Sequence, residues 1–292
     1  MDLRKARIIT AMTTPFNEQG LVDYEQLEKL INFLLENGTE GLVVGGTTGE
    51  SPTLAHEEKI ALYRKTVELT AGRVPIIAGT GSFNTAETIA FTKEVEAISG
   101  IDAALVVVPY YNKPNQAGLY AHFEAVAAST TLPIIIYNVP GRTSVSINPK
   151  TTIKLSAIKN IIGVKECLGL DALSEEIEKT ADDFLVYTGE DGNAFPAKCI
   201  GATGVISVAS HVLGNDIAKM YDLLEEGSLA EAASMHRQLV PKMTSLFTVP
   251  SPAPVKFALN HLGIHVGGTR LPLVICTKEE EAHILKELNW TK

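Results

Sequence analysis

The chain has 292 residues, of which 45% are hydrophobic and 20% are charged. This composition is typical of a folded globular protein and excludes a disordered or low-complexity chain. The 25 Lys and Arg residues against 34 Asp and Glu residues give a formal net charge of −9. We therefore expect neither nucleic acid nor a membrane as a partner, although a local basic patch could bind an acidic metabolite.

The three cysteines, Cys167, Cys199 and Cys276, lie far apart and form no CxxC pair. This pattern favours a reducing compartment. The first residues lead into a strand-like run rather than into the apolar core of a signal peptide. The longest apolar stretch, residues 103–111, is far shorter than the ~20 residues that span a bilayer. We expect a cytoplasmic protein.

Short apolar runs rich in β-branched residues recur along the first three quarters of the chain. They are residues 7–14, 41–44, 75–79, 103–108, 133–137, 161–165, 184–188 and 204–207. Most are continuously apolar, as is typical of parallel strands buried on both faces. Segments with helical periodicity follow them, at residues 24–37, 56–71, 85–98, 116–129, 148–157, 173–180, 193–200 and 216–226.

Eight strands alternating with eight helices predict an α/β fold of the (β/α)8 TIM-barrel type. A doubly wound open sheet is the alternative, because periodicity does not show whether a sheet closes. Beyond Gly227 helix follows helix, with a proline-rich break at residues 250–254. We therefore predict a catalytic barrel over residues 1–226 and an all-helical C-terminal domain over residues 227–292.

Barrel active sites lie at the carboxyl ends of the strands, where this chain has one lysine, Lys165. With a period of two, Ile161, Gly163 and Lys165 share one face of their strand. We expect Ile162 and Val164 to face the outer helices and the Lys165 amine to point into the barrel mouth. Burial disfavours a charged amine and so favours its attack on a carbonyl. A lysine that marks where the strand reaches solvent is the plainer alternative.

Three further features belong to the same end of the predicted barrel. Tyr137 ends the preceding strand, where a phenol could move protons while a carbinolamine forms and dehydrates. Residues 45–51 (GGTTGES) follow the second strand, and their amides with the Thr47 and Thr48 hydroxyls can hold a carboxylate. Arg142, in a loop made rigid by Pro140, suits a second carboxylate. Taken singly, a core tyrosine and a surface arginine are the better explanations of Tyr137 and Arg142. A tight turn explains the glycines as well as a ligand site does, but it explains the two adjacent threonines less well.

Five motifs occur in order along the chain: residues 46–51 (GTTGES), 109–112 (PYYN), 137–140 (YNVP), 163–166 (GVKE) and 188–191 (TGED). On these motifs, essentially the whole chain resembles the dihydrodipicolinate synthase family. This family belongs to the pyruvate-dependent class I aldolases, which also include N-acetylneuraminate lyase. Arg142 and the Tyr110-Tyr111 pair point to the synthases rather than to the sugar-acid lyases.

The resemblance implies condensation of pyruvate with L-aspartate 4-semialdehyde on the diaminopimelate route to L-lysine. Lys165 would form a Schiff base with pyruvate, and Tyr137 would donate and accept protons in a relay with Thr48 and Tyr111. In the family this last tyrosine reaches into the neighbouring subunit's site, which implies homodimer pairs, usually assembled as a homotetramer.

The resemblance also implies the ligand contacts. Thr47 and Thr48 would hold the pyruvate carboxylate, and Arg142 the carboxylate of L-aspartate 4-semialdehyde. Gly189 and Ile206 would give backbone contacts near the lysine. We expect no metal and no organic cofactor, because the lysine imine is itself the electron sink.

Some family members bind L-lysine as a feedback inhibitor at the dimer interface. The residues that match this allosteric site are Ser51, His56, Glu87 and Tyr110. Lys59 and Phe83 depart from it, because the family has a histidine and an asparagine there. A cation at position 59 repels the ammonium groups of L-lysine, and Phe83 removes a polar contact. We expect inhibition by L-lysine to be weak or absent.

Three other functions stay open. A lyase for N-acetylneuraminate or a 2-keto-3-deoxy sugar acid would release pyruvate and would not turn over the semialdehyde. A non-catalytic metabolite-binding barrel would bind its ligand without a covalent adduct. A pyridoxal-phosphate enzyme also needs a lysine imine, and a colourless purified protein would argue against it.

Overall fold

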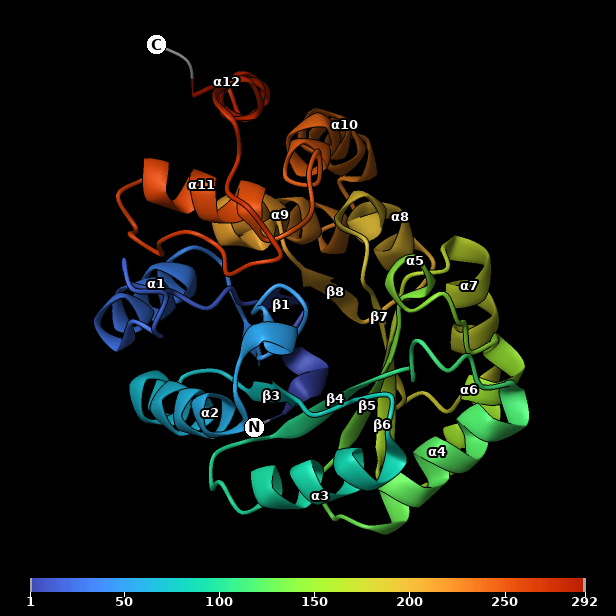
Figure 1. Ribbon diagram of the computed structural model, residues 1–292. Coiled ribbons are helices and arrows are strands. Elements are labelled where there is room, and N and C mark those ends of the chain that lie inside the picture. Colours follow the sequence, from blue (N-terminus) through green and yellow to red (C-terminus); the bar gives the residue numbers. More distant parts are fainter. Residues whose placement is uncertain (1, 291–292) are drawn as a thin grey trace.

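The computed structural model describes residues 2–290, and its strands close into a barrel (Figure 1). Neighbouring strands are parallel and pair in chain order, and β8 (Gly204–Ser207) closes the sheet on β1 (Ile8–Ala11). Between them lie β2 (Gly41–Val44), β3 (Ile76–Gly79), β4 (Ala103–Val107), β5 (Ile134–Asn138), β6 (Ile161–Glu166) and β7 (Leu185–Thr188). The predicted (β/α)8 barrel is confirmed, and the open-sheet alternative is wrong.

Helices surround the barrel on its outside, as Figure 1 shows. They are α1 (Tyr24–Glu36), α2 (His56–Thr70), α3 (Thr85–Glu96), α4 (Gln116–Ala128), α5 (Pro140–Thr143), α6 (Pro149–Leu155), α7 (Leu170–Lys179), α8 (Ala194–Cys199) and α9 (Ser210–Glu225). Helix α1 shows why these segments form helices. Its Leu27, Leu30 and Leu34 are buried on one face. The Asp23 side chain caps its first turn by accepting from the Gln26 amide at 3.0 Å. None of the helices within residues 2–290 is both long and apolar enough to cross a membrane.

Three segments differ clearly from the prediction in where a helix begins or in class, and one of them is α7, which begins at Leu170 rather than at residue 173. Helix α9 begins at Ser210 rather than at residue 216. Leu213 leaves the helical conformation, and a side chain at Gly214 would collide with the carbonyl of Asn37. This kink hides the first turn from a periodicity analysis. Residues 140–143, expected as a loop, form the single turn α5.

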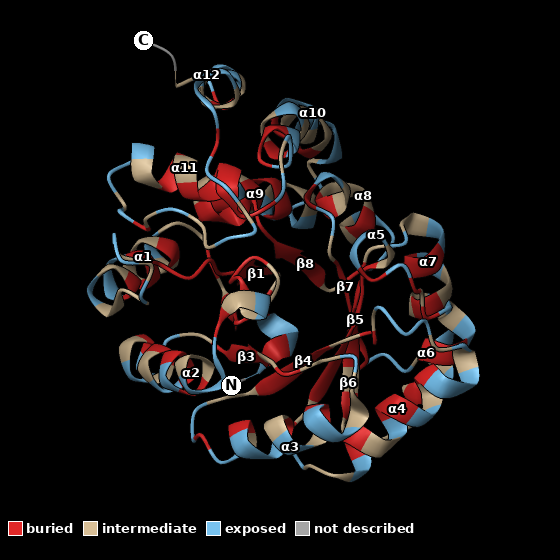
Figure 2. Ribbon diagram, in the orientation of Figure 1, coloured by how far each residue is buried: buried red, intermediate tan, exposed pale blue. Residues whose placement is uncertain are grey.

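Apolar side chains form one shell inside the barrel and another between the strands and the helices. Figure 2 shows the strands almost wholly buried. The inner shell includes Ile9, Val43, Ile77, Ile135, Tyr187 and Ile206. The outer shell includes Val44, Ile76, Val106, Ile136 and Val164. The continuously apolar strands follow from this double burial.

Strand β6 corrects one prediction about the faces of its side chains. The pairing register with β5 shifts between Ile134 and Ile135, so a bulge interrupts the period of two. Ile161 consequently packs in the outer shell, and Ile162 packs against the inner one, the reverse of the prediction. Beyond the bulge the expected alternation returns, with Val164 facing the helices.

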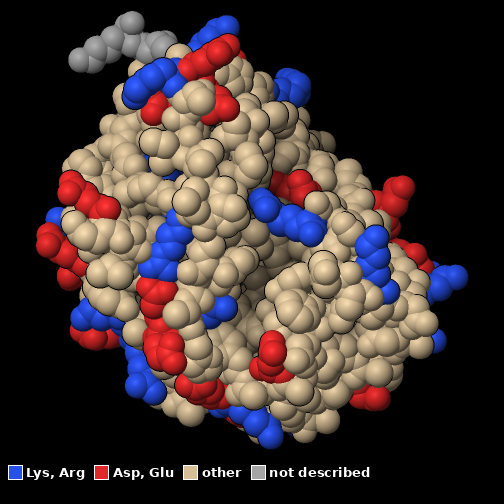
Figure 3. All heavy atoms as spheres, viewed as in Figure 1, with Lys and Arg blue, Asp and Glu red and all other residues tan. Residues whose placement is uncertain are grey.

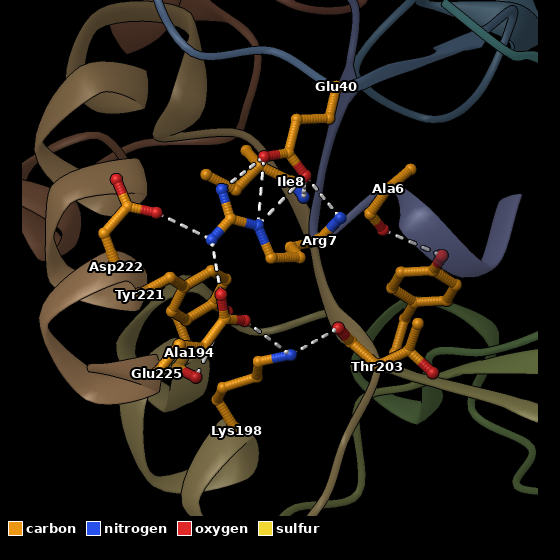
Figure 4. Close-up of polar contacts among 11 residues, drawn as sticks. Ala6, Arg7, Ile8, Glu40, Ala194, Lys198, Thr203, Tyr221, Asp222 and Glu225 are labelled. Atoms are coloured by element: carbon orange, nitrogen blue, oxygen red, sulfur yellow. Dashed lines mark hydrogen bonds and ion pairs between the residues drawn. The ribbon is translucent and has the colours of Figure 1, made fainter. Parts of the chain in front are cut away.

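Arg7, immediately before β1, ties together the amino-terminal end of the barrel (Figure 4). Its guanidinium lies 2.7 Å from Glu40, 2.8 Å from Asp222 and 2.9 Å from Glu225. Lys198 of α8 adds an ion pair with Glu225 at 3.3 Å. This network joins segments distant in sequence at the end of a barrel that serves stability rather than catalysis.

Three further helices follow α9, namely α10 (Leu229–Ser245), α11 (Ala253–His261) and α12 (Lys278–Glu287). The predicted helical appendage is therefore confirmed. One hydrophobic cluster joins Ile8 and Val205 of the barrel to Leu239 and Met243 of α10. Because this core is shared, the division into domains 1–226 and 227–292 stays a prediction. The predicted domains include residues 1, 291 and 292, which lie outside the described residues.

Candidate active site

Lys165 and Tyr137 lie side by side at the carboxyl end of the barrel. They are direct partners in the pairing of β6 with β5, so the sheet fixes their backbones next to each other. Nζ of Lys165 lies 4.4 Å from the centroid of the Tyr137 ring, within the range of a cation–π contact. Only 5% of Lys165 and 7% of Tyr137 are exposed. The lysine is thus buried rather than turned out to solvent, and its expected inward direction is confirmed.

Gly189 leaves the space that the lysine side chain occupies. A Cβ atom at Gly189 would lie 2.8 Å from Cε of Lys165 and would collide with Sγ of Cys167. The Gly189 amide also donates to the Glu166 carbonyl at 2.8 Å. Glycine is therefore required at the end of β7 to keep the amine in place. Its contact with a ligand stays a prediction.

The segment 45–51 forms a tight turn after β2. Gly45 has a φ of 64°, and a side chain there would collide with Tyr63. A side chain at Gly79 of β3 would collide with the Gly45 carbonyl, so the two backbones approach closely. Among the described residues, no hydrogen bond uses the hydroxyl of Thr47 or Thr48. Thr47 lines the cavity described next, whereas Thr48 is 5% exposed and does not line it.

A cavity of ≈ 310 Å³ opens at this end of the barrel. Thr47, Tyr110, Tyr137 and Arg142 line it, together with Lys59. Figure 3 shows the corresponding face hollowed near its middle, with Lys and Arg side chains at the rim. Arg142 is exposed on α5. Basic side chains over a small hollow suit an anionic ligand.

One position beyond the tyrosine and the lysine, the same two strands carry a buried polar pair. Asn138 and Glu166 are partners in register, and neither is exposed. The Asn138 side-chain amide donates to both Glu166 carboxylate oxygens, at 3.0 and 2.9 Å. Oδ1 of Asn138 accepts from the Ile147 amide at 3.2 Å. The pair therefore fastens the segment after α5 to β5 and β6.

Glu176 of α7 interacts with Glu166 of β6, and both side chains are fully buried. Burial raises the pKa of Glu166 to about 7. Burial, followed by the neighbouring charge of Glu166, raises the pKa of Glu176 to about 9. Two buried carboxylates repel each other when both are charged, so this pairing favours a protonated form at one of them.

Five predicted active-site residues do not line the cavity of Thr47 and Arg142, namely Lys165, Thr48, Gly189, Tyr111 and Ile206. Tyr111 has a φ of 69° and is 88% exposed, so its ring stands in solvent in the single chain. Ile206 is fully buried in the inner shell, where it pairs with Ile9 of β1. The structure does not bring either side chain into the cavity of Thr47 and Arg142. Their roles stay predictions.

A second cavity of ≈ 360 Å³ holds four of the six residues matched to the L-lysine site. The four are Ser51, His56, Lys59 and Glu87. Lys59 lines both cavities. Phe83 and Tyr110 are outside the second cavity and pack edge to face, with ring centroids 5.4 Å apart. The cation at position 59 thus lies where the prediction required it, in the wall of the cavity.

Sequence reasoning missed two buried pairs at this site. Asn138 with Glu166 was detectable in principle, because they directly follow Tyr137 and Lys165 on adjacent strands. The second pair, Glu50 with Lys256, has its carboxylate and Nζ 2.7 Å apart. The sequence could not show that these two residues pair, because they are separated by most of the chain. The sequence does indicate that Lys256 has some buried partner, because it lies within the apolar run of α11.

The model of the dihydrodipicolinate synthetase family matches residues 4–290. The 4-hydroxy-tetrahydrodipicolinate synthase of Enterococcus faecalis is 58% identical over 288 residues, which cover 99% of each chain. A solved structure of dihydrodipicolinate synthase from Bacillus anthracis has a TM-score of 0.96 and 49% identity, and covers 99% of both chains.

A third relative concerns assembly. It is a solved structure described as the first monomeric dihydrodipicolinate synthase variant, with a TM-score of 0.94 and 38% identity, covering 99% of this chain and 98% of that one. The match thus extends over the barrel, the motifs around Lys165 and the C-terminal helices. The chain belongs to the dihydrodipicolinate synthetase family.

Proposed function

We propose that the protein condenses pyruvate with L-aspartate 4-semialdehyde to form 4-hydroxy-tetrahydrodipicolinate. The observation that carries this proposal is the buried amine of Lys165 against the Tyr137 ring. Both lie at the carboxyl end of a barrel, beside a cavity lined by Thr47 and Arg142. A relative 58% identical over nearly its whole length bears the name of this activity.

The reaction begins with attack of the neutral Lys165 amine on C2 of pyruvate. One proton of the amine passes to the carbonyl oxygen, and a second proton then lets that oxygen leave as water, so that a protonated C=N bond to the lysine remains. Tyr137, whose ring lies 4.4 Å from Nζ of Lys165, is proposed to supply and recover these protons. Loss of a proton from C3 of pyruvate then gives an enamine, in which the methyl carbon is nucleophilic.

The enamine carbon attacks the aldehyde carbon of the second substrate, forming a C–C bond and an oxyanion that takes up a proton. The amino group of this substrate then attacks the imine carbon, and the C–N bond to Lys165 breaks. The lysine returns to its amine form, and the ring of the product is closed. One water leaves for each pair of substrates condensed.

Each substrate brings a carboxylate that the cavity can hold. Thr47 and Thr48 are proposed to bind that of pyruvate, since their hydroxyls have no other partner among the described residues. Backbone groups at Gly189 and Ile206 would complete the first subsite. Arg142, exposed at the rim, is proposed to bind the carboxylate of the semialdehyde, bidentately.

The relay is proposed to need a second subunit. Tyr111 is almost fully exposed on one chain, and a tyrosine that enters a partner's site has to project from its own subunit in this way. We propose homodimers that complete each other's sites and assemble into a homotetramer. The three free cysteines accord with a cytoplasmic location, where thiols stay reduced.

The test compares acceptors and donors with the purified protein. It is expected to consume pyruvate in the presence of L-aspartate 4-semialdehyde and to release no pyruvate from N-acetylneuraminate or from 2-keto-3-deoxy sugar acids. Pyruvate release from a sugar acid, with no turnover of the semialdehyde, would replace this proposal with the lyase alternative.

A further inference from the structure

Glu50 holds an unusual backbone conformation directly after the two threonines. Its φ of 56° and ψ of 35° are left-handed, which a residue with a side chain adopts only at a cost in free energy. The Glu50 amide donates to the Thr47 carbonyl at 3.1 Å. The shape of the threonine turn therefore depends on how Glu50 is held.

The C-terminal helices hold it. Lys256 of α11 places Nζ 2.7 Å from the Glu50 carboxylate, and 2% or less of either side chain is exposed. The same Nζ donates to the Gly268 carbonyl at 2.6 Å and lies 4.1 Å from the centroid of the Phe16 ring. The second Glu50 oxygen accepts from the Arg270 amide at 2.9 Å.

Arg270 binds residues that follow the turn. Its guanidinium donates to the Thr53 carbonyl at 2.8 Å and forms an ion pair with Glu58 of α2. It also lies 4.3 Å from the centroid of the Phe16 ring. Residues 256–270 therefore hold the segment that follows the threonines at Glu50, Thr53 and Glu58.

Stability alone is a poor explanation for such a pair. Removing two charges from water costs about as much as their attraction returns, and apolar side chains often fill such sites with no loss of stability. Burial lowers the pKa of Lys256 to about 8, which reflects this cost. A buried pair that joins two distant segments does fix their relative position.

We propose that Lys256 and Glu50 are positioning residues that hold Thr47 and Thr48 in the arrangement that binds the pyruvate carboxylate. The C-terminal helices thereby form a supporting part of the pyruvate subsite. The inference rests on the function proposed above, because it assigns the threonine turn to pyruvate.

The test is the double variant Lys256→Met with Glu50→Gln, which removes both charges and leaves neither unpaired. The matched control is Leu239→Ala, which opens a cavity at a 2% exposed position of α10. Leu239 belongs to the hydrophobic cluster that also includes Ala253 and Ala258 of α11. For each protein we would measure thermal stability, kcat, and KM for each substrate. Should the double variant not fold, Glu50→Gln alone is judged by the same criteria.

We expect the double variant to raise KM for pyruvate about tenfold, which corresponds to about 1.4 kcal/mol, and to change KM for the semialdehyde less than about twofold. Leu239→Ala should lower thermal stability and leave both KM values near wild type. An unchanged KM for pyruvate would overturn the inference, and so would equal rises in both KM values. If the wild type forms no borohydride-stable adduct with pyruvate, the proposed function fails instead.

Discussion

Nζ of Lys165 lies 4.4 Å from the centroid of the Tyr137 ring, and the two residues lie side by side on paired strands. The sheet rather than a flexible loop therefore sets their separation. On the proposed function, the phenol of Tyr137 exchanges protons with the nitrogen and oxygen atoms that react during imine formation. The pair accounts for why a lysine lies at the end of a buried strand.

The Tyr137→Phe variant tests the proton-transfer role. Its ring keeps the contact with the lysine, so only the hydroxyl is lost. We expect kcat to fall by about 10²-fold or more, as is typical when a general acid–base group is removed. Steady-state kinetics would measure this loss, and unchanged thermal stability would show that the fold is intact. A variant with wild-type kcat would exclude Tyr137 from proton transfer.

Subunit mixing tests the role of Tyr111. Lys165→Ala and Tyr111→Phe subunits should each be nearly inactive as homo-oligomers. A mixed dimer has one intact site, formed by Lys165 of one subunit and Tyr111 of the other. We expect co-expression to restore about half of the wild-type activity per mixed dimer. No recovery in confirmed mixed oligomers would show that Tyr111 serves its own subunit.

Inhibition by L-lysine tests the second cavity. Lys59 lines this cavity, where its charge repels the ammonium groups of L-lysine, and Phe83 lies outside it. We therefore expect millimolar L-lysine to change the rate less than about twofold. The Lys59→His, Phe83→Asn double variant restores the family's residues and should become sensitive. Rate measurements against L-lysine concentration decide the matter. Strong inhibition of the wild type at micromolar L-lysine would contradict the prediction.

The buried acid pair makes stability depend on pH. The pKa values of Glu166 and Glu176, about 7 and about 9, lie above the usual value of 4.5. The folded protein therefore keeps protons that the unfolded chain releases above that value. The stabilising effect is complete below pH 4.5 and is lost as pH rises through 7 to 9.

The Glu176→Gln variant should flatten this decline, because its amide can donate to Glu166 at every pH. We expect a gain on the order of 1 kcal/mol at pH 8–9, a rise in Tm of about 2–4 °C, and no gain at pH 5. Glu175→Gln is the control, since Glu175 is only half-buried and pairs with Lys179. Parallel pH profiles for Glu176→Gln and wild type would refute protonation of the pair.

The barrel and the position of Lys165 could be predicted from the sequence because both depend on local patterns. Apolar runs of four to eight residues predicted the strands, and a lysine at the end of one such run indicated the site. The directions of Ile161 and Ile162 could not be predicted, since a bulge depends on how two strands pair. The error stayed local, because the alternation resumes before Lys165.

The supporting pairs depend on contacts between segments distant in sequence. Glu50 follows β2 and Lys256 lies on α11, so only the fold brings them within 2.7 Å. Glu176 is one of several acidic residues on α7, and nothing in its neighbours shows that it faces inward. Patterns along a chain indicate which residues carry the chemistry, whereas packing determines which residues hold them in place.

The central claim is that Lys165 forms an imine with pyruvate, and borohydride trapping tests it most directly. The protein is incubated with pyruvate, reduced, digested, and the modified peptide is mapped by mass spectrometry. The account predicts one stable pyruvate adduct, on Lys165, and none on the Lys165→Ala variant. An unmodified protein, under conditions that trap a known pyruvate aldolase, would contradict the account and leave a barrel that binds its ligand without covalent chemistry.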